Sequence, residues 1–140
     1  MKELEIKVKH NSYIHLASFE VNSILELVAP DSEKIEIVVA DKTYKVNVKS
    51  LRLLCFKESQ TCVVCGKIGT IITLNRNVND KQNAHPHFNL FADNLDGTFN
   101  LMTKDHICPK SKGGKNHLSN LQTMCKICNE KKGSNYEIEL

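Results

Sequence analysis

The 140-residue sequence has no apolar run near the ~20 residues that a membrane-spanning helix needs, so we expect no membrane partner. Its first ten residues, MKELEIKVKH, lack the apolar segment of a secretory signal, which predicts a cytoplasmic protein. Internal repeats and low-complexity tracts are also missing. Hydrophobic residues make up 41% and charged residues 25% of the chain, a composition that predicts an ordinary folded protein and excludes a disordered one.

Net charge is small, at +3, but it is unevenly distributed. Residues 1–60 carry equal numbers of basic and acidic side chains, whereas residues 104–132 contain seven lysines against only Asp105 and Glu130. A local basic field of this kind attracts a polyanion such as nucleic acid.

Four of the six cysteines form two identical pairs, Cys62-x-x-Cys65 and Cys125-x-x-Cys128. A single C-x-x-C pair fits a redox dithiol or chance equally well. Two pairs in one reducing compartment instead predict a structural Zn²⁺ held by four thiolates, with no open position for chemistry. Cys55 and Cys108 are unpaired by spacing, and we expect them to be bystanders.

The predicted fold class is α+β, in two parts. Residues 1–60 are expected to form a small α+β accessory module of unknown role, with a β-hairpin over residues 35–48 and a helix beginning after Ser50. Residues 61–140 are expected to form a zinc domain. Within it, Asp96-Gly97 predicts a second hairpin, Gly133 ends a short helix, and the polar stretch 75–85 is expected to be a surface excursion.

The segment TKDHICPKSKGGKNHLSNLQTMCKICNEKKG, residues 103–133, strongly resembles the HNH endonucleases, specifically those with C-x-x-C pairs on either side of the motif. The resemblance extends over about residues 62–133. It implies a ββα-metal domain in which His106 is the general base, Asp105 and Asn129 hold a catalytic metal, and Asn120 orients the histidine by pinning the loop.

Elementary chemistry agrees with those roles. Phosphodiester hydrolysis needs an activated water and a cation that carries charge on the phosphate. His106 has the side chain whose ordinary pKa suits a base near neutral pH. Asp105 and Asn129 offer oxygen ligands, which suit Mg²⁺ or Mn²⁺.

Six lysines near the motif are predicted to contact phosphates of the substrate: Lys110, Lys112, Lys115, Lys126, Lys131 and Lys132.

The sequence therefore predicts a metal-dependent endonuclease that cuts DNA. Two alternatives remain: a zinc-stabilised nucleic-acid-binding module without catalysis, and a protein-interaction adaptor. Cutting both strands would need a homodimer or a second event. The abundance of asparagine and lysine is compatible with a phage or mobile element in a bacterial host.

Overall fold

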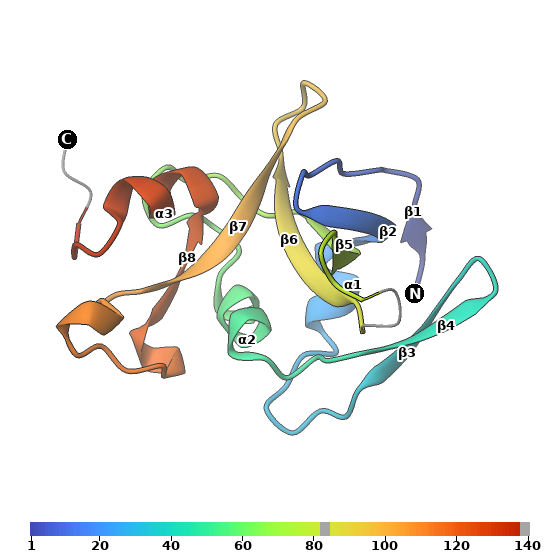
Figure 1. Ribbon diagram of the computed structural model, residues 1–140, viewed down its shortest axis with the longest axis horizontal. Coiled ribbons are helices and arrows are strands. Elements are labelled where there is room, and N and C mark those ends of the chain that lie inside the picture. The colour runs from blue at the N-terminus through green and yellow to red at the C-terminus, as the bar shows by residue number, and fades with distance from the viewer. Residues whose placement is uncertain (82–84, 138–140) are drawn as a thin grey trace.

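The computed structural model describes residues 1–81 and 85–137 and has a mixed α+β fold (Figure 1). Most of its strands form one antiparallel sheet in the order β1-β2-β5-β6-β7-β8, and β3 and β4 form a separate hairpin. The strands are β1 (Glu3–Leu4), β2 (Tyr13–Glu20), β3 (Ile35–Val39), β4 (Lys42–Val46), β5 (Ile71–Asn77), β6 (His87–Asp93), β7 (Phe99–His106) and β8 (Leu121–Cys125). The helices are α1 (Val21–Leu25), α2 (Leu51–Glu58) and α3 (Lys126–Lys132), with short 3₁₀ turns at Lys110–Lys112 and Leu118–Asn120.

Local sequence explains the helix that was expected after Ser50. The Ser50 side chain accepts a hydrogen bond from the backbone N–H of Leu53 and so caps the first turn of α2. Phe56 and Leu53 on α2 are buried against the sheet. At the other end of the chain, α3 ends at Gly133, as predicted.

The hairpin expected over residues 35–48 is present as β3 and β4. Its turn falls at Ala40 and Asp41, both with positive φ. Two successive positive φ values twist the turn to match paired strands. The second expected hairpin is also present, since β6 pairs with β7 around Gly97.

The sheet joins the two halves of the sequence. β2 pairs along its length with β5, so residues on both sides of position 60 share the sheet. One hydrophobic core contains Ala17 and Phe19 from β2 together with Ile72 from β5 and Met124 from β8. The hydrophobic core therefore extends across the boundary expected at residue 60.

Residues 75–77, expected at the surface, instead end β5, with Asn75 buried; residues 82–84 of that polar stretch lie outside the described chain. No helix within the described ranges is both long and apolar enough to cross a membrane.

Candidate functional site

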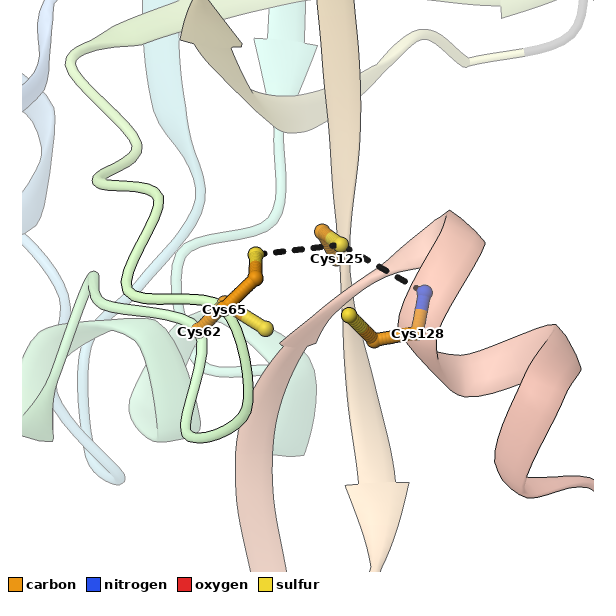
Figure 2. Close-up of side chains that lie close together, drawn as sticks. All are labelled: Cys62, Cys65, Cys125 and Cys128. Carbon is orange, nitrogen blue, oxygen red and sulfur yellow. Dashed lines mark hydrogen bonds between the residues drawn. The ribbon is translucent and has the colours of Figure 1, made fainter. Parts of the chain in front are cut away.

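The four cysteines of the two C-x-x-C pairs meet at one point, as Figure 2 shows. All four sulfur atoms lie within 4.8 Å of one another, and the sulfurs of Cys65 and Cys125 are 3.8 Å apart. A tetrahedral Zn²⁺ with Zn–S bonds of ~2.3 Å separates its sulfurs by about 3.8 Å. The cluster therefore has the donor set and the size to hold a zinc ion.

Two tight turns bring these sulfurs together. The first pair lies in a loop where the N–H of Gly66 bonds to the carbonyl of Cys62, and Gly66 has a φ of +80°, which favours glycine. The N–H of Val63 bonds to the carbonyl of Thr123, which ties this loop to β8. The second pair spans the junction of β8 and α3, where the Cys125 sulfur accepts the N–H of Cys128.

The thiols of the cluster differ in their acidity. Burial opposes ionisation of Cys62, but backbone N–H groups of Cys65, Cys125 and Val64 together lower its pKa to about 7. Burial, thiol hydrogen bonds and the nearby charge of Cys62 raise the pKa of Cys128 to about 12. Four thiolates so close together repel one another, and a divalent ion at their centre removes that penalty.

A cleft of about 330 Å³ lies beside this cluster, between the end of β7, the loop that follows it, and α3. Asp105, His106 and Asn129 all line it. Asp105 and His106 are the last two residues of β7, while Asn129 follows the cluster ligand Cys128 on α3. The structure thus brings three of the four residues expected to be catalytic to one cavity.

Asp105 is buried, with 6% of its surface exposed, and each oxygen of its carboxylate has a partner. The Nε2 of Gln122 on β8 donates to Oδ2 at 2.9 Å. The ammonium of Lys132 lies 3.1 Å from Oδ2 and 3.2 Å from Oδ1, and it also donates to the carbonyl of His106 at 3.1 Å. A buried ion pair therefore fixes the end of β7 to α3.

Lys132 is only 2% exposed, so its position differs from that of an exposed phosphate contact. Helical spacing explains the difference, because Lys132 lies three residues after Asn129, on the face of α3 that packs against β7. Lys132 was expected to contact a phosphate of the substrate, but its ammonium instead forms an ion pair with the buried carboxylate of Asp105.

Asn120, the fourth residue, is not among the residues that line the cleft, and it holds the loop that follows His106. Its Oδ1 accepts the N–H of Cys108 at 2.8 Å, and its Nδ2 donates to the carbonyls of Cys108 and Lys115 at 3.1 and 2.9 Å. Gly114 is needed in this loop because a Cβ there would lie 1.7 Å from the carbonyl oxygen of Cys108.

Hydrogen bonds orient the other two cleft residues. The Nε2 of His106 lies 3.1 Å from Oδ1 of Asn116, an exposed residue of the same loop. The Nδ2 of Asn129 donates to the hydroxyl of Thr103 at 2.7 Å, and Thr103 in turn donates to the carbonyl of Met124. Asn129 is therefore turned so that its Oδ1 is the atom left to bind a ligand.

The remaining predicted lysine contacts are exposed, but they differ in position. Lys110 lines the cleft. Lys126 pairs with Glu130 one helical turn away, and the ammonium of Lys112 lies over the ring of Tyr136. Lys115 and Lys131 are exposed on the loop and on α3.

Sequence reasoning missed several residues of this site: Lys104, which lines the cleft, and the partners Thr103, Asn116 and Gln122. The alternation of side chains along a strand was the available signal for Thr103, since it places Thr103 and Asp105 on one face of β7. Asn116 lies in an irregular loop and has no such periodic signal.

The described residues thus place a four-cysteine cluster beside a cleft lined by aspartate, histidine, asparagine and lysine side chains. Residues 96–140 match the family model of the HNH endonucleases, which confirms the resemblance for that part of the chain. The match indicates a nuclease-type function with a nucleic-acid substrate. No curated protein and no solved structure gives a match.

Proposed function

We propose that the protein is a metal-dependent endonuclease that hydrolyses phosphodiester bonds in DNA. The observation that carries the proposal is the single cleft lined by Asp105, His106 and Asn129 within the segment that matches the HNH endonucleases. A module that only binds nucleic acid has no need for a base and two oxygen ligands in one cavity.

His106 is the general base in this proposal. With the Asn116 amide oriented as in the structure, the Nε2 of His106 carries the hydrogen that Oδ1 accepts, so Nδ1 is free to take a proton from water. The contacts made by Asn120 keep the loop that carries Asn116 in place. Asn120 therefore acts through Asn116 as a positioning residue.

The cleft has oxygen donors suited to a hard divalent ion. Asp105 provides a carboxylate and Asn129 provides an amide oxygen, and both line the same cavity. These two residues would hold Mg²⁺ or Mn²⁺, which supplies charge stabilisation for the scissile phosphate and the leaving oxygen when bound. The four-cysteine cluster would hold a separate structural Zn²⁺ that fixes Asn129 through Cys128.

Lysines that line or surround this cleft would guide the polyanion to it. Lys104 and Lys110 line it, with Lys112, Lys115, Lys126 and Lys131 on the surrounding loop and helix. Zinc with four thiolates contributes about −2 to the same region, so the net field is weaker than the lysine count suggests.

Plasmid cleavage tests the proposal. We expect purified protein to convert supercoiled DNA to nicked or linear forms with Mg²⁺ or Mn²⁺, and to stop when a chelator removes the metal. Binding of DNA with no cleavage under any divalent metal would contradict the proposal and favour a binding module. Capture of protein partners without DNA binding would favour an adaptor.

The ion pair of Lys132 leads to a prediction about stability. Lys132→Met leaves the buried Asp105 carboxylate without its cation, so we expect the free energy of unfolding to fall by about 3–5 kcal/mol when no Mg²⁺ or Mn²⁺ is added. If Asp105 is a metal ligand, added Mn²⁺ should raise the melting temperature more in this variant than in the wild type, because the ion no longer competes with an ammonium.

Thermal unfolding with and without Mn²⁺ measures this difference. Lys131→Met is the matched control, since Lys131 is the exposed neighbour on α3. Equal Mn²⁺ shifts in the wild type and in Lys132→Met would show that Asp105 does not bind the metal.

A further inference from the structure

Arg52, at the start of α2, is a cation whose described partners are all uncharged. Its Nη1 donates to Oδ1 of Asn89 at 3.0 Å, and its Nη2 donates to the carbonyl of Phe88 at 2.5 Å. Burial lowers the pKa of Arg52, but a guanidinium stays charged at neutral pH. A desolvated charge held only by neutral acceptors is costly, and an anion beside it removes much of that cost.

Arg52 lines two neighbouring cavities, of about 250 and 110 Å³. The larger one is also lined by Asn47, His87 and Lys104. Within residues 1–81 and 85–137, the side chains that line these two cavities include no aspartate or glutamate. The site is therefore basic and already oriented, because Asn89 is itself fixed by a hydrogen bond to Asn75 inside the sheet.

Lys104 connects this cavity with the proposed active cleft, since it lines both. It immediately precedes Asp105 on β7. A polyanion bound in the cleft with its scissile phosphate near His106 thus has a second cationic cavity next to it. The cavity also lies at the amino-terminal end of α2, where the helix dipole adds positive potential.

We propose that the cavity around Arg52 binds a phosphate of the nucleic acid backbone that is adjacent to the phosphate at which the strand is cut. This inference rests on the proposed function and extends it, because it gives residues before position 60 a role in holding the substrate. Arg52 contributes a fixed guanidinium fork, which suits phosphate oxygens, and Lys104 contributes a charge shared between the two cavities.

Duplex DNA binding tests the proposal when cleavage is prevented. All variants are made in the His106→Ala background and assayed by fluorescence anisotropy without added Mg²⁺ or Mn²⁺ and without chelator, so that any zinc remains bound. Arg52→Gln should weaken binding about tenfold. It should also reduce the slope of log K against log salt concentration by about 1. Lys45→Gln removes one exposed charge from β4 and is the control.

Asn47→Asp tests the same cavity without removing a hydrogen bond of the fold. Oδ1 of Asn47 accepts the N–H of Lys49, and a carboxylate oxygen can accept it too. The new negative charge beside Arg52 should lower DNA affinity several-fold, whereas Asn22→Asp on the exposed side of α1 should have less effect. This variant also answers the question if Arg52→Gln does not fold.

Three results would overturn the inference. In the first, Arg52→Gln and Asn47→Asp bind DNA as tightly as their controls, while the wild type still cuts plasmid. This result refutes the phosphate site around Arg52 and leaves the proposed function intact. The wild type could neither bind nor cut DNA, and the proposed function then fails as well. Inorganic phosphate could stabilise the wild type but not Arg52→Gln while DNA affinity is unchanged, which would assign the cavity to a free anion.

Discussion

His106→Ala should keep its fold and zinc content yet lose plasmid cleavage by about 10²–10⁴-fold, the contribution expected of a general base. The side chain is at the end of β7, where it is half-buried and makes one described side-chain hydrogen bond, to Asn116. Its removal therefore costs little packing. The main chain remains fixed, because Lys132 holds the carbonyl of His106 rather than its ring.

Initial rates of supercoil loss under saturating Mg²⁺ or Mn²⁺ measure the effect. His117→Ala is the matched control, since His117 is an exposed histidine of the loop between β7 and β8 and does not line the cleft. It should cut at nearly the wild-type rate. Equal rates for His106→Ala and the wild type would refute the assignment of the base, whatever the cluster binds.

Several features of the fold were predictable because their sequence signals are local. Each C-x-x-C pair closes a tight turn by itself, and the two identical pairs predicted the convergence that the four sulfurs show. Ser50, Gly97 and Gly133 each occupy the cap or turn that their chemistry favours. The resemblance of residues 103–133 to the HNH endonucleases is confirmed over 96–140.

Long-range pairing was not predictable in the same way. The end of β5 was expected to be a surface loop because asparagines such as Asn75 and Asn77 favour loops. Asn75 is instead buried, and it forms hydrogen bonds with Asn89 and Thr73. These polar residues belong to a network that includes Arg52, so their burial depends on a residue from another element. A sequence pattern shows the polarity of a residue but not the partner that compensates for it.

Lys132 illustrates the same limit within the candidate site. A run of lysines predicts a charged surface, and Lys131 follows that rule. Lys132 does not, because it lies on the face of α3 toward β7, where Asp105 compensates its charge. The sequence analysis predicted separate roles for Asp105 and Lys132, and their mutual contact follows only from the packing of α3 against β7 (Figure 1).

Cys125→Ser should abolish stoichiometric zinc binding and unfold much of the C-terminal part of the chain. Cys125 is 1% exposed, it ends β8 and its sulfur caps α3, so these two elements meet at this residue. The two cysteine pairs are separated by 59 residues, and a metal joining them closes a long loop. Structural zinc binding in small domains is worth about 10–16 kcal/mol, which is comparable to the whole stability of a typical domain, so loss of the ion should unfold the part that it holds.

Metal analysis of freshly purified protein and thermal unfolding measure the two parts of this prediction. Cys55→Ser is the matched control: Cys55 is also buried, but it lies on α2 outside the cluster and contacts Thr123. It should retain one zinc per chain and lose only about 1 kcal/mol, because a serine hydroxyl can keep a hydrogen bond to Thr123.

The comparison separates the metal from the packing. If both variants lose stability equally and the wild type contains no zinc, burial of the cysteines stabilises the fold and the four-thiolate site is refuted. If only Cys125→Ser loses zinc, DNA cleavage should fall with it, although Asp105 and His106 are unchanged. The reason is that Asn129 follows Cys128 directly, so the cluster fixes one wall of the cleft.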